Sequence, residues 1–165
     1  MKKILSIAVF TTFCACFCVY GQRNAQTKVA GNYSYTVSCL GTELDGSQTL
    51  EVWGYGRNRF DAAEQAKKNA VYAVLFDGIR DGREGCEVKP LLTGVNAREK
   101  HQNYFNQFFA DKGEYLNYVS LRDERIDNKF TREKKGAKHG NTRSVIVRVL
   151  RPQLEQKLIS DNILK

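Results

Sequence analysis

The sequence lacks the short motifs that identify the common hydrolases and zinc enzymes. It has no Gly-x-Ser-x-Gly nucleophile elbow and no His-Glu-x-x-His motif. Histidine is scarce, and His101 and His139 stand alone, without a second ligand at a metal-binding spacing. We therefore predict no catalytic residue, no bound metal and no cofactor. The alternative is an enzyme whose active site is assembled from side chains scattered along the chain, which no motif reveals.

Composition excludes two further classes of protein. Charged residues make up 27% of the chain and hydrophobic residues 42%, so neither a disordered tail nor a multi-span membrane protein fits. A length of 165 residues allows one domain of ordinary size. The sequence therefore predicts a single globular domain and leaves little room for a second.

A Gly-Tyr-Gly sequence at 54–56 lies where a strand is expected to lead into a helix, which is the usual place of a phosphate-binding loop. The third glycine of the dinucleotide fingerprint is missing, because Arg59 occupies its position, and no Lys-Ser/Thr pair follows. We therefore expect Gly54 and Gly56 to let the chain turn tightly into the helix rather than to hold a nucleotide.

Residues 1–21 have the pattern of a secretory signal peptide. Lys2 and Lys3 precede a mostly apolar run over 4–20, and small residues near its end suit cleavage after Gly21. We therefore predict an exported protein that is periplasmic or on the cell surface.

Two alternatives to cleavage after Gly21 stay open. The apolar run could be retained as a membrane anchor, although it is short for a bilayer span. Residues 13–16 loosely match a lipobox, so Cys16 is a candidate for lipidation, which would associate the protein with the outer membrane.

Cleavage after Gly21 removes three of the five cysteines and leaves Cys39 and Cys86. Two cysteines in an oxidising compartment favour one disulfide bond between them. Two unpaired buried thiols are the alternative. Metal binding is the weaker interpretation, since neither cysteine has a partner at Cys-x-x-Cys spacing.

Hydrophobic periodicity predicts an α+β domain over 32–165, after a flexible leader at 22–31. The predicted order of elements is ββααββα. Helices that are grouped between pairs of strands indicate a two-layer domain with a mainly antiparallel sheet. The expected elements are strands at 33–39 and 50–55, helices at 60–77 and 96–110, strands at 115–121 and 144–150, and a last helix from 152. A long charged connection over 122–142 joins the last two strands.

The helix at 60–77 has one stripe of small residues, which would let it lie close to a sheet. Ala66 and Ala70 belong to this stripe, whereas Glu64, Lys67 and Lys68 are expected in solvent on the other side. Asp61 and Glu64 have capping-box spacing, which predicts the start of the helix. Gly78 suits its C-terminal stop.

Aromatic residues are concentrated in two places, around 53–55 and over 104–118. Together they could line a binding groove, but an aromatic core is the favoured interpretation. The aromatic residues considered for either role are Trp53, Tyr55, Tyr104, Phe105 and Phe109.

The run Trp53-Gly54-Tyr55-Gly56, with alanines at 62, 63, 66 and 70 and Leu75, resembles the small outer-membrane lipoprotein superfamily. This superfamily includes the N-terminal domain of flagellar assembly protein T, and the similarity covers about residues 32–150. The resemblance implies an envelope domain that acts by protein contact and has no catalytic residues. The missing clean lipobox departs from the lipoprotein members, and the aromatic block at 104–118 indicates a subfamily of its own.

Positive charge is concentrated at 129–151, where eight basic side chains stand against one acid. The first part of this segment has no apolar periodicity, and its simplest role is a solvated loop. The functional alternative is contact with an anionic envelope component such as lipid headgroups, an acidic polysaccharide or an acidic protein face. The candidate residues are Lys129, Arg132, Lys134, Lys135, Lys138 and Arg143.

These features together predict an exported, non-enzymatic cell-envelope protein that acts as a binding or assembly module. Its expected partner is another envelope protein or an anionic envelope component, with peripheral membrane contact as one form of the latter. Export disfavours nucleic acid as a partner despite the net charge of +8. The alternatives are an enzyme without a recognisable motif and an anion-binding surface protein.

Overall fold

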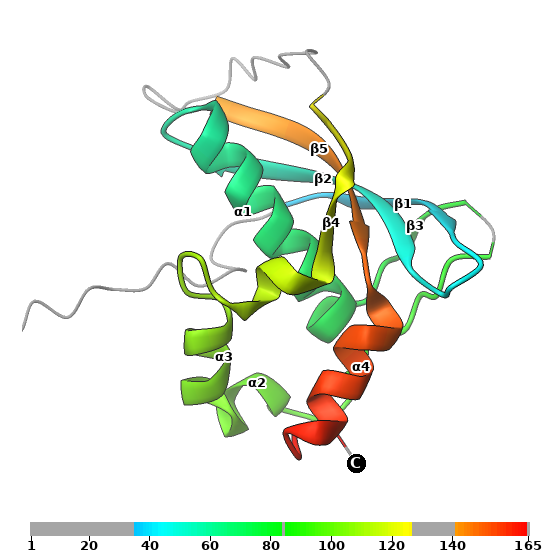
Figure 1. The fold of residues 1–165 in the computed structure, drawn as a ribbon, viewed down its shortest axis with the longest axis vertical. Coiled ribbons are helices and arrows are strands. Elements are labelled where there is room, and N and C mark those ends of the chain that lie inside the picture. Colours follow the sequence, from blue (N-terminus) through cyan, green and yellow to red (C-terminus); the bar gives the residue numbers. More distant parts are fainter. Residues whose placement is uncertain (1–34, 84, 127–140, 165) are drawn as a thin grey trace, which may run out of the picture.

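The computed structural model describes residues 35–83, 85–126 and 141–164. Within these ranges the chain forms five strands and six helical segments (Figure 1). In chain order they are β1 (Val37–Thr42), β2 (Gln48–Gly56), α1 (Arg59–Tyr72), the π-helical segment η1 (Ala73–Asp77), β3 (Asp81–Gly82), α2 (Ala97–Lys100), α3 (Gln102–Phe108), the 3₁₀ segment η2 (Glu114–Tyr118), β4 (Val119–Ile126), β5 (Asn141–Val149) and α4 (Arg151–Ser160).

The five strands form one sheet in the order β3-β1-β2-β5-β4. The β1–β2, β2–β5 and β5–β4 pairs are antiparallel, and the two-residue β3 is parallel to β1. Helix α1 packs across β2 and β5, while α2, α3 and α4 gather near its C-terminal end (Figure 1). The structure confirms the predicted α+β fold with a mainly antiparallel sheet.

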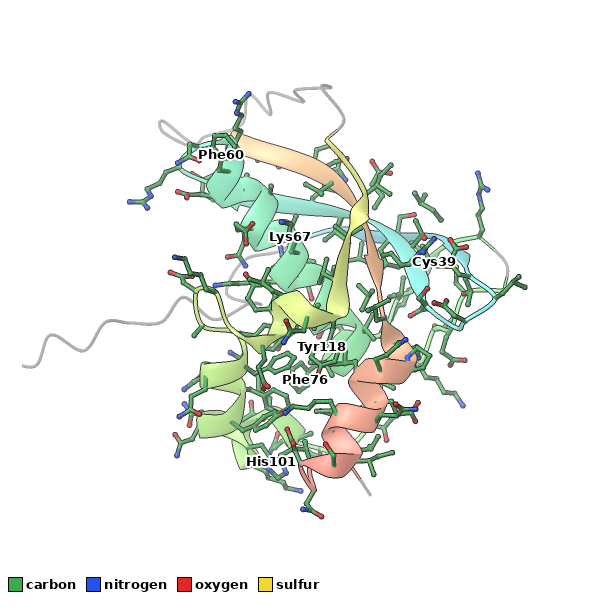
Figure 2. The ribbon with its side chains drawn as sticks, in the orientation of Figure 1. Cys39, Phe60, Lys67, Phe76, His101 and Tyr118 are labelled. Atoms are coloured by element: carbon green, nitrogen blue, oxygen red, sulfur yellow. A yellow bond between two sulfur atoms is a disulfide. The ribbon has the colours of Figure 1, made fainter. Side chains whose placement is uncertain are left out.

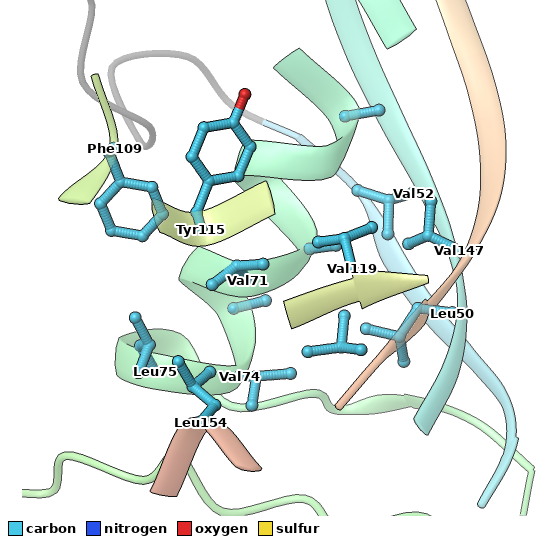
Figure 3. Close-up of a cluster of buried hydrophobic side chains, with 14 of the residues drawn as sticks. Leu50, Val52, Val71, Val74, Leu75, Phe109, Tyr115, Val119, Val147 and Leu154 are labelled. Carbon is cyan, nitrogen blue, oxygen red and sulfur yellow. The ribbon is translucent and has the colours of Figure 1, made fainter. Parts of the chain in front are cut away.

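The main core lies between α1 and one face of the sheet (Figure 3). Leu50 and Val52 of β2 and Val147 of β5 are fully buried there against α1. Ala66 and Ala70 are fully buried as well, so the predicted orientation of the alanine stripe is confirmed. Burial of aliphatic side chains on both layers is the dominant favourable contribution to folding.

The start of α1 differs from the predicted capping box. Asn58 is the N-cap, and its side-chain oxygen accepts hydrogen bonds from the backbone N–H groups of Phe60 and Asp61 at 2.9 and 3.0 Å. Asp61 lies in the first turn instead and pairs with Arg57 at 3.1 Å. An asparagine at this position satisfies the free N–H groups, so Asp61 is not needed as a cap. The predicted stop at Gly78 is confirmed, with φ of 72°.

The side of α1 that was expected in solvent is partly covered, because Glu64 is exposed but the two lysines beside it are not. Lys67 and Lys68 keep only 8% and 5% of their side-chain surface exposed, and Lys67 lies midway along the helix (Figure 2). Nζ of Lys67 lies 3.0 Å from Glu64, and Nζ of Lys68 lies 2.8 Å from Asp111. The prediction of two solvated lysines is wrong, because carboxylates placed beside them make burial of the ammonium groups tolerable.

The predicted helix at 96–110 is divided at His101, whose φ of −118° and ψ of 33° separate α2 from α3. Phe105 and Phe108 of α3 are buried, but α2 has no buried residue. Packing of aromatic side chains stabilises α3 but not α2. No buried side chain of α2 therefore favours one continuous helix over two segments.

The predicted strand at 115–121 begins as the 3₁₀ segment η2, and only Val119 onward is strand. Residues three apart share a side in a 3₁₀ turn. Tyr115 and Tyr118 accordingly both reach the aromatic cluster, where their rings lie 6.1 and 5.9 Å from those of Phe109 and Phe108. Packing of both tyrosine rings against this cluster explains why 114–118 is a 3₁₀ segment rather than a strand.

The predicted charged connection over 122–142 is shorter than expected. Strand β4 continues to Ile126, which pairs with Val145, and β5 begins at Asn141. Because β4 is an edge strand, it can accommodate charged residues that a central strand would exclude. Residues 127–140 lie outside the described residues. The predicted order ββααββα is therefore incomplete. It lacks β3 and the two η segments, and it gives one helix where the structure has α2 and α3.

Candidate functional site

The predicted disulfide is present. Cys39 of β1 and Cys86 of the loop after β3 are bonded, with their Cα atoms 6.3 Å apart. The backbone N–H of Arg83 donates to the carbonyl of Cys39 at 3.0 Å, which ties the same loop to β1. Because its sulfur is bonded, Cys86 offers neither a nucleophile nor a metal ligand in this state.

Most of the predicted anion-contact residues lie outside the described residues. Lys129, Arg132, Lys134, Lys135 and Lys138 belong to this group, as does the lipidation candidate Cys16. Arg143 is in β5, where its Cα faces Gly54 of β2, and Asn141 faces Gly56. The C-terminal end of the basic segment therefore joins the fold beside the junction of β2 and α1.

The aromatic side chains that were considered for a groove belong to different surroundings. Phe105 and Phe109 are buried in the core, and Tyr104 donates from Oη to Asp161 at 2.6 Å. Trp53 and Tyr55 alternate with the buried residues of β2 and lie on the other side of the strand. An aromatic core is confirmed for Phe105 and Phe109, and these five side chains do not form one groove.

A cleft of about 470 Å³ lies beside the first half of α1, and its volume falls in the range of small-molecule sites, roughly 300–1,000 Å³. We call it the α1 cleft. It is lined by the end of β2 with the turn after it, by one flank of α1, and by Asp111, Lys112, Tyr115 and Leu116. Six of its side chains are charged, namely Arg57, Asp61, Glu64, Lys68, Asp111 and Lys112.

Lys68 provides a nearly buried cation at the wall of the α1 cleft. Its ammonium group lies 2.8 Å from Oδ1 of Asp111 and 5.5 Å from the ring centre of Tyr115. The Asp111 side chain is 98% exposed, so the pair connects the interior to solvent. A cation over an aromatic ring is attracted by the negative face of the ring, which helps to hold Lys68 in place.

Glu64 connects a second group of polar atoms in the cleft. Its Oε1 lies 3.0 Å from Nζ of Lys67, and its Oε2 accepts a hydrogen bond from Oη of Tyr115 at 3.2 Å. Burial of Tyr115, followed by the nearby charge of Glu64, raises the pKa of its hydroxyl above the ordinary value. Tyr115 therefore stays protonated and acts as a hydrogen-bond donor rather than as an acid.

Lys112 is the cation of the α1 cleft that has no partner among the described residues. Arg57 pairs with Asp61 at 3.1 Å, and Lys68 pairs with Asp111. Lys112 is exposed and lies in the turn between α3 and η2, with φ of 61°. The cleft therefore combines paired charges, hydrogen-bond acceptors and one available cation, an arrangement that suits binding of a polar ligand.

The face of β2 and β5 opposite α1 forms a second surface, which we call the outer face. Ser144 donates from Oγ to Oε1 of Glu51 at 2.7 Å, so the two strands are linked across it by side chains. Trp53 and Ile146 contribute half-buried apolar surface. The outer face comprises Thr49, Glu51, Trp53, Ser144, Ile146 and Arg148.

Within 35–83, 85–126 and 141–164, no helix has the length and apolar content needed to cross a bilayer. The same part of the chain contains no group of three or more histidine, cysteine, aspartate or glutamate residues that could hold a metal ion.

Comparison of the chain with protein-family models, with curated proteins and with solved structures found no match. The resemblance to the small outer-membrane lipoprotein superfamily therefore stays a prediction.

Tyr55 was considered for a groove, but the charged residues of the α1 cleft were not identified from the sequence. Glu64 and Lys68 resemble ordinary charged positions on a helix surface, and Lys112 lies in a turn where such residues are common. Only the neighbouring Gly113 indicates a tight turn. The cleft is formed by segments more than 40 residues apart, as in the hydrogen bond between Lys68 and Asp111 at a separation of 43, which no local pattern records.

Proposed function

We propose that this chain is an exported, non-enzymatic module of the cell envelope that binds another envelope protein through its outer face. The outer face is the observation that carries the proposal. It combines a tryptophan and an isoleucine with hydrogen-bonding and charged side chains, and tryptophan and arginine are enriched where proteins bind one another. The bond between Cys39 and Cys86 is compatible with an exported protein.

The polar chemistry of the described residues also favours a module over an enzyme. Four tyrosines have raised pKa values, and burial is the first cause in each. Three of them, Tyr35, Tyr104 and Tyr115, each donate a hydrogen bond to a carboxylate, namely Asp77, Asp161 and Glu64. Their higher pKa values make them weaker acids, whereas catalysis at neutral pH needs groups that titrate near it. These contacts stabilise the fold.

A photo-crosslinking amino acid at position 146 tests the proposal in cells that produce the chain naturally. We expect crosslinks from 146 to one defined envelope protein, because this position lies at the centre of the outer face. The matched control is position 156 of α4, which is exposed and lies on a helix away from the outer face. Equal crosslinking from both positions, or none from 146, contradicts the proposal.

Contact with an anionic envelope component is a second candidate function, and the position of the basic segment favours it. Asn141, where the described chain resumes, faces Gly56 across the β2–β5 pair. Arg57 follows Gly56 directly and Arg59 lies two residues further on, and the Arg57 side chain is 84% exposed. Asn141, the described end of the basic segment, therefore lies beside the turn that carries two further arginines. Clustered cations raise affinity for anionic surfaces.

A further inference from the structure

We propose that the α1 cleft binds a short acidic saccharide, a ligand with one carboxylate and several hydroxyl groups. This inference goes beyond the protein contact proposed above and does not depend on it, because the described charged residues of the cleft are not part of the outer face. The volume of about 470 Å³ is adequate for such a ligand.

The carboxylate of the ligand would meet Lys112. This lysine lines the cleft, is exposed, and has no partner among the described residues. The other two lining cations each have a carboxylate beside them, Arg57 at 3.1 Å and Lys68 at 2.8 Å. One available cation matches one carboxylate through a charge-assisted hydrogen bond.

The hydroxyl groups of the ligand would meet the acidic wall of the cleft. Asp61, Glu64 and Asp111 all line it, and their side chains are 37%, 49% and 98% exposed. Each already has a donor within the protein, but an ionised carboxylate has about four acceptor sites, so the remaining sites can accept hydrogen bonds from hydroxyl groups of a ligand. They would repel a ligand with several negative charges, such as a nucleotide. This repulsion favours a saccharide with a single acidic group.

The backbone at Lys112 supports a functional role for this residue. Its φ of 61° lies in the left-handed region, which costs free energy for residues other than glycine. Gly113 follows with φ of −71° and is required for another reason, since a Cβ atom there would lie 2.4 Å from the carbonyl oxygen of Phe108. A lysine thus occupies the position where glycine would be unstrained, and strain of this kind concentrates at binding sites.

The test uses the exported chain with its disulfide intact and titrates it with a trisaccharide of two galactose units and one galacturonate, which carries a single carboxylate. Binding is followed by calorimetry and by NMR shifts of backbone amides. We expect saturable binding, with shifts at Gly56, Lys112 and Gly113. The methyl ester of the same trisaccharide, which keeps the rings and loses the charge, should bind at least tenfold more weakly. A capped peptide with one glutamate, which has the same charge, should not compete.

Two variants of Lys112 separate binding from folding. Lys112→Gln should weaken binding of the trisaccharide at least tenfold with an unchanged melting temperature. Lys112→Gly should weaken it equally while the melting temperature stays or rises by about 2–4 °C, because glycine relieves the left-handed strain. Asn162→Gly relieves a similar φ of 57° elsewhere, and Lys100→Gln removes an exposed charge of α2. Both controls should bind like the wild type.

Several results would overturn the inference. Equal binding of the trisaccharide and its methyl ester would show that the carboxylate is not recognised. Wild-type affinity in Lys112→Gln, or amide shifts confined to other parts of the chain, would exclude the α1 cleft. Competition by the glutamate peptide would indicate recognition of charge alone, and no binding of the trisaccharide at millimolar concentration would reject a saccharide site.

Discussion

Gly54 of β2 lies against Ala66 of α1 so closely that a Cβ atom on Gly54 would be 2.5 Å from the Ala66 nitrogen. Gly56 has the same relation to Ala62, with 2.4 Å to its nitrogen. Both glycines lie within β2 and neither has a positive φ, so the expectation that they form a tight turn is wrong. They are required because the backbone of α1 comes too near to leave room for a side chain.

Gly54→Ala should therefore destabilise the fold by about 1–3 kcal/mol, since the added methyl group forces α1 away from β2. Urea unfolding measures the change. The matched control is Gly41→Ala in β1, where a Cβ atom would have no neighbour within 4 Å. That variant should stay within about 0.5 kcal/mol of the wild type. Equal stability of both variants would contradict the close contact.

Loss of the disulfide should lower stability by roughly 4 kcal/mol, because the bond between Cys39 and Cys86 closes a loop across a sequence separation of 47. We expect reduction and the double variant Cys39→Ala with Cys86→Ala to lower the urea midpoint similarly. An unchanged midpoint after reduction, or two free thiols in the unfolded and unreduced protein, would contradict the bond.

The hydrogen bond from Tyr104 to Asp161 should make stability depend on pH at both extremes. Tyr104, with Lys157 nearby, lowers the pKa of Asp161 below its ordinary value of 3.8. Because the folded pKa is the lower one, this contribution is present above about pH 4 and is lost as the pH falls further. Burial, with the bond to Asp161, raises the pKa of Tyr104, so its contribution is present below about pH 10 and is lost above it.

Tyr104→Phe removes this hydrogen bond and should flatten both ends of the profile. Unfolding free energy, measured in urea from pH 2 to pH 11, checks the change. The largest difference from the wild type is expected between about pH 5 and pH 9, where both groups are in their stabilising forms. A constant difference at every pH would mean that the pair does not titrate as described.

The basic segment should contribute to binding of anionic surfaces without contributing to stability. Replacing Lys134, Lys135 and Lys138 with glutamine should weaken binding to vesicles of anionic lipid at low salt and reduce its salt dependence. The melting temperature should stay nearly unchanged. Cosedimentation at two salt concentrations measures this, and equal binding by variant and wild type would leave the segment with only a solubilising role.

The sequence correctly predicted those features that depend on residue types and spacings within the chain itself. The alanine stripe that includes Ala66 and Ala70 identified the buried side of α1, and two remaining cysteines indicated their own pairing. Burial of Lys67 and Lys68 could not be predicted, because it depends on partners such as Asp111 that the fold brings from elsewhere. The 3₁₀ segment at Tyr115 was missed for the same reason, since its position is set by aromatic rings of α3.

Export is the premise on which the disulfide, the envelope partner and the anionic contact all depend, and the intact mass of the chain from the envelope fraction of its native cells tests it most directly. The account predicts a chain that begins at Gln22 and contains the bond between Cys39 and Cys86. A chain that retains Met1, is found in the cytosol and has free thiols at both cysteines would contradict the account. A lipid on Cys16 would contradict the predicted cleavage after Gly21.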